Sequence, residues 1–232
     1  MKKFFLFAAA AIAALTVNAK VLDLTTVGTT INEWNVTEAT LNESASDADA
    51  GKYVYDIVAG VESLTNLLAD PDIVFGIKNG SDKAKAFVVY PGKCYEFGGK
   101  NGILYIKNTV AGDKILLTVA AKGSTAANFA DAAGAFPVNA IAVSADLTLP
   151  AKGSEGADEQ GYVWKELEYV SLGGEVQIKE FAGGYRISKI QVGAAEGVEN
   201  VFDNAKATKT FENGQLVIIK NGVRYNALGV QL

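Results

Sequence analysis

The sequence predicts an all-β protein, an antiparallel β-sandwich of the jelly-roll, galactose-binding-like kind with a small C-terminal β-meander. Three observations support this fold class. About ten short runs of β-forming residues are separated by turn signals roughly every 8–15 positions, which is typical of sandwiches. No segment with helical periodicity is long enough for parallel βαβ units. Near the end of the chain, Asn213-Gly214 and Asn221-Gly222 predict two tight hairpin turns.

At the centre of the chain, Gly102–Asn108 and Lys114–Ala121 alternate as strands do, with Thr109–Asp113 between them. A short link containing a glycine predicts that they are neighbouring antiparallel strands in the middle of one sheet. The residues that share a face are Leu104 with Ile106 on the first run, and Ile115, Leu117 and Val119 on the second.

Further strands are predicted on both sides of this pair. They cover Val21–Thr26, Glu33–Val36, Tyr53–Val58, Ile73–Lys78, Ala84–Tyr90, Val138–Leu149, Tyr162–Val170, Glu175–Phe181 and Tyr185–Val192. Asn79-Gly80 predicts a hairpin between the fourth and fifth of these. Thr37 is a start signal for a brief helix over Glu38–Ser44. The apolar parity of the last strand changes near Ser188-Lys189, which predicts a β-bulge. Lys122–Phe136 fits either a long loop or a loose helix.

The first nineteen residues have the pattern of a secretory signal peptide. Lys2 and Lys3 precede an apolar run, and Val17-Asn18-Ala19 ends in a small residue that suits a signal peptidase. An uncleaved anchor is the alternative, although the run is shorter than the roughly 20 residues of a membrane span. We therefore expect an exported protein that begins near Lys20, with no transmembrane segment after cleavage, in the periplasm, at the cell surface or outside the cell.

The predicted organisation is a signal peptide at 1–19, a β-sandwich domain at 20–193, a linker at 194–206 and a β-meander tail at 207–232. Two-residue loops fix the register of the tail. They place Phe211 opposite Leu216, Ile218 opposite Tyr225, and Lys220 opposite Val223. The alternative is that these strands belong to the main domain.

Composition excludes several classes of function. The net charge of −5 provides no basic surface for nucleic acid or for an anionic membrane. The chain has no histidine, which removes Ser-His-Asp and Cys-His nucleophile systems and His-ligated zinc. Cys94 is the only cysteine, so no intramolecular disulfide forms. Lys93 beside it could favour a thiolate, but an inert buried thiol is the alternative. We expect no cofactor and no enzymatic activity.

Paired acids are the remaining candidates for metal binding or hydrolysis. Asp70-Pro-Asp72 and Asp47-Ala-Asp49 could bind calcium through carboxylate oxygens, or they could be solvated loop acids without the spacing of a calcium motif. Glu166 and Glu168 share one strand face and could act as the acid and base of a glycosidase. The alternative is that they form the solvent face of a half-buried strand.

Aromatic residues are the candidates for ligand binding, because an aromatic face can stack on a sugar ring. Each of them could instead fill the core. The group consists of Trp34, Tyr53, Tyr55, Tyr90, Tyr162 and Trp164. Trp164 shares strand parity with Glu166 and Glu168, which predicts that it lies on the wetter face. The ligand-binding candidates are Trp164, Glu166, Trp34 and Tyr162.

Several segments resemble a known domain. The similarity lies in the segments FGG…I.I…AGDKI.LTV and GG.RI..I.V, in the Trp34-Asn-Val-Thr run and in the strands described above. In them the chain is similar to a jelly-roll accessory domain of secreted bacterial pectate-lyase-like and other glycan-degrading proteins. This resemblance covers roughly residues 33–193 and implies a carbohydrate-associated, non-catalytic module. The tail ENGQLVIIKNGVRYNALGVQL looks like C-terminal modules that some exported bacterial proteins use for sorting to the surface. The catalytic domain that such modules accompany has no counterpart in this sequence.

Three functions are therefore open. The first is a secreted, non-catalytic protein that binds a polysaccharide or glycan, with export or sorting machinery as the partner of its tail. The second is a structural or adhesive surface protein that binds no sugar. The third is a small polysaccharide lyase or glycosidase. Exposed aromatic residues gathered in one place would favour the first, and burial of all of them would favour the second.

Overall fold

The computed structural model describes residues 19–78, 86–99 and 102–194, together with the three strands between 208 and 226. The chain divides into two compact units, Met1–Ala195 and Glu196–Leu232. Apart from Ala19 and Ala194, the predicted signal peptide and the predicted linker lie outside the described residues, and so do the three Asn-Gly turns. The described part of the chain contains one short 3-10 helix, η1 (Ile31–Glu33), and otherwise strands and loops. No helix within it has the length and apolar character needed to cross a membrane.

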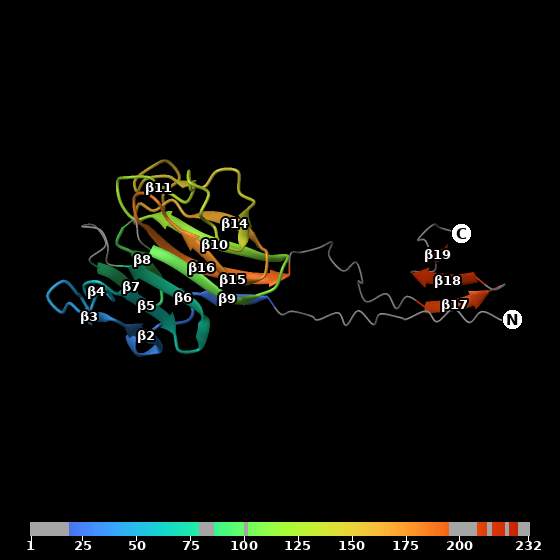
Figure 1. Cartoon of the computed structure of the whole chain (residues 1–232), viewed down its shortest axis with the longest axis horizontal. Coiled ribbons are helices and arrows are strands. Elements are labelled where there is room, and N and C mark those ends of the chain that lie inside the picture. Colours follow the sequence, from blue (N-terminus) through green and yellow to red (C-terminus); the bar gives the residue numbers. More distant parts are fainter. Residues whose placement is uncertain are drawn as a thin grey trace. The chain divides into compact units, whose positions relative to one another are not determined.

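The first unit is an antiparallel β-sandwich, as the sequence predicts, and Figure 1 shows its two main sheets. The larger sheet has the strand order β12-β14-β10-β16-β8-β7-β4-β3, and β1 pairs with β16 outside this path. Its strands are β1 (Lys20–Asp23), β3 (Ala39–Leu41), β4 (Tyr53–Ile57), β7 (Ala86–Tyr90), β8 (Cys94–Phe97), β10 (Asp113–Ala121), β12 (Ala140–Ala142), β14 (Lys165–Ser171) and β16 (Tyr185–Ala194).

The smaller sheet has the order β15-β9-β6-β5-β2. Its strands are β2 (Trp34–Thr37), β5 (Glu62–Leu67), β6 (Asp70–Lys78), β9 (Gly102–Thr109) and β15 (Gly174–Lys179). A further pair, β11 (Ala127–Asn128) with β13 (Thr148–Leu149), stands apart from both sheets.

Alternating side chains of both sheets form one hydrophobic core. Leu104 and Ile106 on β9 are buried, and so are Ile115, Leu117 and Val119 on β10, which confirms the predicted faces. A set of stacked rings also joins the sheets, because Phe75 of β6 lies 4.4 Å from Tyr95 of β8 between ring centroids.

The predicted pairing of the two central strands is wrong. Strand β9 pairs with β6 and β15, whereas β10 pairs with β14 and β16 in the other sheet. The link between them turns the chain from one layer to the other, and the buried Asp113 holds it by accepting a 2.7 Å hydrogen bond from the Val110 backbone N–H. Two strands that face each other across a core alternate just as hydrogen-bonded neighbours do, so periodicity alone does not identify the partner.

The hairpin predicted at Asn79-Gly80 is also wrong, because the two strands that flank it lie in different sheets. Strand β6 pairs with β5 and β9 in the smaller sheet, while β7 pairs with β4 and β8 in the larger one. Strand β5, which the sequence analysis did not predict, is the hairpin partner of β6.

Two other local predictions are wrong. In place of a helix over Glu38–Ser44 the chain forms β3, which pairs with β4. Glu38 has φ +55°, which is outside the helical region and lets the chain change direction before β3. The single strand expected over Val138–Leu149 is two short ones, β12 and β13, in different sheets. The segment Lys122–Phe136, which fitted a loop or a helix, is a loop that contains β11.

The predicted bulge is confirmed. The pairing of β16 with β10 shifts between Thr118 and Val119, which lie opposite Lys189 and Ile187, so Ser188 is the additional residue. The extra residue explains why the apolar parity of β16 changes there.

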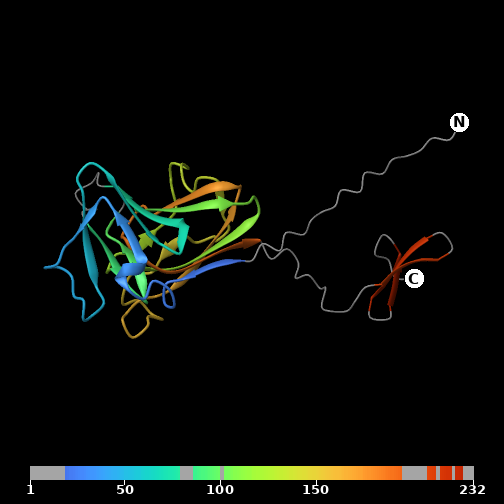
Figure 2. The same cartoon turned by 90° about the horizontal axis from the view of Figure 1, so that it is seen from below.

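The second unit contains one sheet of three strands, β17 (Thr208–Glu212), β18 (Gln215–Lys220) and β19 (Val223–Asn226), seen in Figure 2. All three predicted pairs are confirmed: Phe211 with Leu216, Ile218 with Tyr225, and Lys220 with Val223.

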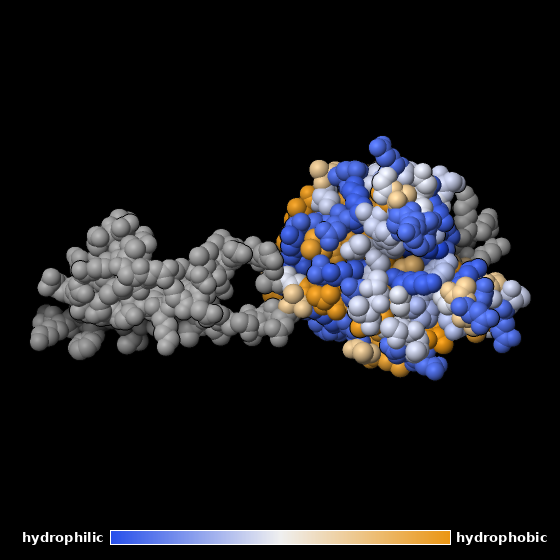
Figure 3. Space-filling model, turned by 180° about the vertical axis from the view of Figure 1, so that it is seen from behind, coloured by the Kyte–Doolittle hydropathy of each residue, from blue (hydrophilic) through white to orange (hydrophobic). Residues whose placement is uncertain are grey.

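On the face of the first unit that Figure 3 shows, groups of hydrophobic residues alternate with hydrophilic ones. Large hydrophobic residues with high exposure come from separate elements, among them Leu68, Val110, Ile141 and Leu172. Exposed hydrophobic residues of this kind are normal on protein surfaces.

Candidate functional site

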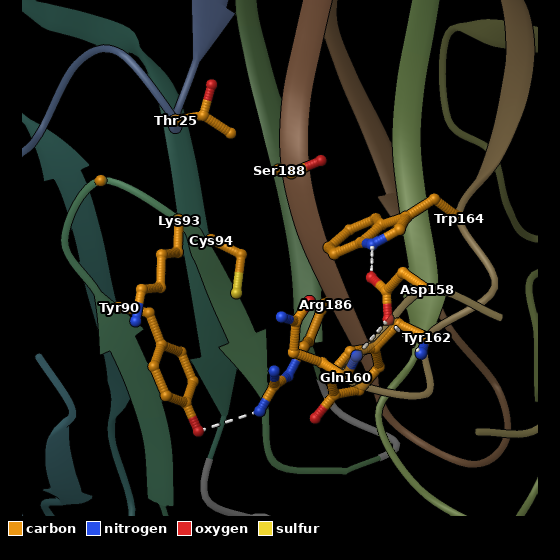
Figure 4. A pocket seen from close by; sticks show the side chains of 11 residues that line it. Thr25, Tyr90, Lys93, Cys94, Asp158, Gln160, Tyr162, Trp164, Arg186 and Ser188 are labelled. Atoms are coloured by element: carbon orange, nitrogen blue, oxygen red, sulfur yellow. Dashed lines mark hydrogen bonds between the residues drawn. The ribbon is translucent and has the colours of Figure 1, made fainter. Parts of the chain in front are cut away.

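A pocket of about 440 Å³ lies on the larger sheet of the first unit, and Figure 4 shows the side chains around it. This volume is within the range of small-molecule sites. The lining residues are Thr25, Tyr90, Gly92, Lys93, Cys94, Asp158, Gln160, Tyr162, Trp164, Arg186 and Ser188. They come from the loop after β1, the β7–β8 turn, the loop before β14, and β16 around its bulge.

Strand alternation explains why these polar and aromatic residues meet outside the core. On β7, β8 and β16 the core residues Val89, Tyr95 and Ile187 are buried, so their sequence neighbours point to the opposite face. Arg186 is directly opposite Glu96 in the pairing of β16 with β8. The pocket therefore lies on the outer face of the larger sheet, close to where Ser188 interrupts the regular pairing.

Arg186 is the centre of one wall of the pocket. Its guanidinium carbon lies 4.5 Å from the ring centroid of Tyr90 and 4.2 Å from that of Tyr162, so the cation sits near both rings. Its Nε donates a 2.7 Å hydrogen bond to Oε2 of Glu96, and its Nη2 donates one of 2.9 Å to the Tyr90 hydroxyl. Burial is the largest single influence on Arg186 and lowers its pKa, but the Glu96 carboxylate and the neighbouring Cys94 and Tyr90 together raise the pKa of the guanidinium above its ordinary value. Arg186 is thus a fixed, permanently charged group.

Asp158 organises the opposite wall. Its Oδ1 accepts hydrogen bonds from the backbone N–H groups of Tyr162 (2.8 Å) and Gln160 (3.0 Å). Its Oδ2 accepts a 2.9 Å hydrogen bond from the indole Nε1 of Trp164. The backbone donor of Tyr162 is the largest cause of the lowered pKa of Asp158, and the indole also contributes. The carboxylate therefore closes the loop and at the same time orients the ring of Trp164, as the dashed lines in Figure 4 show.

Two titratable groups of the pocket keep their protons at neutral pH. Cys94 is buried, and burial raises the pKa of its thiol to about 12 in spite of the nearby Arg186. The thiol is therefore not a thiolate nucleophile, and Lys93 does not make it one. Burial together with the Glu96 carboxylate raises the pKa of Tyr90 to about 12.

Comparison of the chain with models of known protein families, with curated proteins and with solved structures found no match. The chemistry of the pocket therefore has to be inferred from its own residues.

The structure brings together two of the four residues that the sequence analysis selected for ligand binding. Trp164 and Tyr162 both line the pocket, with ring centroids 6.2 Å apart. Tyr162 is only 7% exposed, and the cations of Arg186 and Lys152 lie 4.2 Å and 4.3 Å from its ring centroid, so Trp164 is the ring that can stack on a ligand. Glu166 is exposed on β14 and is not among the lining residues. Trp34 is 7% exposed and lies in the core, where its Nε1 donates a 3.0 Å hydrogen bond to the Gly28 carbonyl, so it has no ring face for a ligand.

The calcium candidates Asp70 and Asp72 already have a cationic partner. Lys20 Nζ lies 2.5 Å from Oδ1 of Asp70 and 3.1 Å from Oδ2 of Asp72. The hydrogen bond from Lys20 is the largest cause of the lowered pKa of Asp72. A calcium ion at these two carboxylates would have to displace the ammonium group. Among the described residues, no group of three or more acidic or cysteine side chains is arranged to hold a metal ion.

The acid pair Glu166 and Glu168 does not form a site of its own. Glu168 makes a salt bridge of 3.3 Å with Lys114 on the neighbouring strand, and neither glutamate lines the pocket. Their placement on the outer side of β14 agrees with the solvent-face alternative.

Sequence reasoning missed Arg186 and Asp158, which fix the two walls. Signals for both were present. Arg186 is a charged residue between the apolar Tyr185 and Ile187 on a strand that faces the core. Asp158 stands four positions before Tyr162, in a loop whose glycine at 161 permits a tight turn with φ +86°.

The pocket offers one partly exposed indole ring, a fixed guanidinium, an ammonium group at Lys93, and the amide of Gln160. An aromatic face beside hydrogen-bonding groups suits a ring that is apolar on its faces and polar at its edge.

Proposed function

We propose that the protein is a secreted, non-catalytic carbohydrate-binding protein, and that the sugar binds in the pocket at Trp164. A pyranose ring stacks on the indole, and its hydroxyl groups bond to the polar side chains around it. The observation that carries this proposal is the hydrogen bond between Trp164 Nε1 and Asp158, which holds an aromatic ring at the edge of a polar pocket.

The family resemblance to a carbohydrate-associated jelly-roll domain supports the same function. We also propose that the sandwich is of the jelly-roll type. The Asp158 carboxylate already accepts three N–H donors, and the Cys94 thiol keeps its proton at neutral pH. Binding without turnover is therefore the simplest chemistry that the pocket residues support.

The experiment is a glycan array with the protein from Lys20 to Leu232, followed by calorimetry on the glycans that bind. Trp164→Ala should weaken binding by about 1–3 kcal/mol, the scale of one large side chain removed from contact. Ile141→Ala, which truncates an exposed residue that does not line the pocket, is the matched control and should leave the affinity unchanged. Failure of every glycan to bind would remove the proposal and favour the structural or adhesive alternative.

The C-terminal meander serves export or attachment to the cell surface in this proposal, with sorting machinery as its partner. Its separation as a compact unit and its resemblance to sorting modules support this role. Deletion of 206–232 should give a protein that folds and still binds its glycan but stays in the periplasm, as measured by cell fractionation and calorimetry. A shortened protein that fails to fold would assign these strands to the main domain.

A further inference from the structure

The charge of the pocket has the opposite sign from the charge of the whole chain. Its lining contains two cations, Lys93 and Arg186, and one carboxylate, Asp158, whereas the chain has a net charge of −5. Lys93 is exposed and takes part in none of the salt bridges found among the described residues. Its ammonium group is therefore available to a ligand.

Arg186 adds a second, fixed donor to the lining of the same pocket. The hydrogen bonds to Glu96 and Tyr90 use its Nε and Nη2, and the two tyrosine rings hold the guanidinium in place. A guanidinium has more N–H donors than these contacts use, and Nη1 donates no hydrogen bond to any described residue. A pre-oriented guanidinium edge matches a planar carboxylate well.

The two carboxylates near the pocket do not cancel this preference. Asp158 already accepts three N–H donors, which spread its negative charge over the loop and the indole. Glu96 lies behind Arg186 with its side chain 13% exposed, and Lys122 also approaches it at 3.8 Å. Both acids are thus occupied by protein donors, while Lys93 is exposed and the Arg186 side chain keeps 16% of its surface exposed.

We infer that the pocket selects sugars that carry a carboxylate, such as uronic acids, and that Lys93 and Arg186 bind this group while the sugar ring stacks on Trp164. This inference rests on the proposed carbohydrate binding and names the class of sugar. In the view of Figure 4, Lys93 and Tyr90 lie on one side of Arg186 and Trp164 lies on the other, with the guanidinium directed toward the Tyr90 hydroxyl.

The experiment compares matched ligands by calorimetry: oligosaccharides of glucuronate and glucose, of galacturonate and galactose, and a sulfated galactose oligosaccharide. We expect each uronate to bind at least about tenfold more tightly than its neutral counterpart at low salt, and the difference to shrink as salt screens the exposed ammonium. Lys93→Gln should reduce the preference for the uronate about fivefold and leave the affinity for the neutral sugar unchanged, whereas Lys93→Arg should retain the preference.

Lys93 is chosen for substitution because it is exposed, while removal of Arg186 would leave Glu96 without its partner and could unfold the protein. Lys107→Gln, which removes an exposed lysine from β9 outside the pocket lining, is the matched control and should change neither affinity.

Equal binding of uronate and neutral sugar would overturn the carboxylate preference and leave carbohydrate binding intact. Tighter binding of the sulfated sugar than of the uronate would overturn the assignment to a carboxylate. Absence of binding by all of these sugars and on the array would overturn both proposals.

Discussion

The protein uses aromatic residues in two regions with opposite surroundings. In the core, Tyr95 stacks on Phe75 at 4.4 Å and on Phe87 at 5.3 Å between ring centroids, so rings are held by other rings. In the pocket, Tyr162 and Trp164 are 6.2 Å apart, and charged groups fix them instead. Arg186 lies near the ring of Tyr162, and Asp158 holds the indole of Trp164.

The two tryptophans show the same contrast. The indole N–H of Trp34 donates to a backbone carbonyl in the core, whereas that of Trp164 donates to a carboxylate at the surface. A ring held by apolar neighbours contributes mainly to stability. Trp164 is held by a carboxylate outside the core and stays partly exposed, so it can bind a ligand without a large contribution to folding.

The largest expected effect comes from removal of a core ring. Phe75→Ala removes a fully buried ring that contacts Trp34, Tyr95 and Phe97, and should lower the free energy of unfolding by about 3–5 kcal/mol. Urea denaturation followed by circular dichroism measures this change.

The matched substitution in the pocket is Trp164→Ala. It should lower the free energy of unfolding by only about 1 kcal/mol or less, because this ring is partly exposed and is not among the residues of the hydrophobic core. Similar losses for the two variants would contradict the division between a structural and a binding set of rings.

A smaller effect is expected for the charged pair behind the pocket. Glu96→Ala leaves the partly buried Arg186 without its ion pair and should lower the free energy of unfolding by about 2 kcal/mol. Because Arg186 also positions Tyr90 and Tyr162, the same variant should weaken glycan binding, which calorimetry measures.

Glu96→Gln is the control for this substitution, since it retains a hydrogen-bond acceptor for Nε of Arg186. Its effect on both quantities should be smaller than that of Glu96→Ala. If Glu96→Ala lowers stability without any change in affinity, the Arg186 wall is structural only.

Some parts of this architecture follow from the sequence for a physical reason. Side-chain alternation reports which face of a strand is buried, so the faces of β9 and β10 were predictable. The change of parity at Ser188 identified the bulge, and two-residue turns fixed the register of the second unit. Each of these features is encoded within a few neighbouring residues.

The pairing of strands was not predictable in the same way. Strands β9 and β10 are consecutive and well patterned, yet they lie in opposite sheets because the exposed link before Asp113 passes from one sheet to the other instead of closing a hairpin. The choice between these connections depends on packing among strands that are distant in the sequence.

The site was partly predictable. Parity placed Trp164 on the wetter face, but Trp34 occurs in a similar strand context and is buried. What distinguishes them is the set of partners, Asp158 for one and Gly28 for the other. Arg186 reaches the pocket only because β16 pairs with β8, a contact across about ninety positions of sequence that no local pattern contains.

The smallest expected effect is a pH-dependent signal that separates the two tryptophans. The hydrogen bonds to Asp158, first of all the one from the Tyr162 backbone, lower its pKa below the ordinary value of 3.8. A carboxyl group with a lowered pKa stabilises the folded loop above its ordinary pKa, and this contribution is lost as the pH falls through the lowered pKa.

In an NMR titration, the indole N–H signal of Trp164 should therefore shift with a midpoint below pH 3.8, because protonation removes the charge that accepts its hydrogen bond. The indole N–H signal of Trp34 should show no such midpoint of its own, because its acceptor is a backbone carbonyl that does not titrate. Asp158→Asn keeps a side-chain oxygen but cannot titrate, so it should abolish the shift of Trp164 and leave the signal of Trp34 in place. A midpoint at or above 3.8, or a Trp164 shift that survives in Asp158→Asn, would show that another group holds this ring and that the carboxylate is not what separates the pocket tryptophan from the core one.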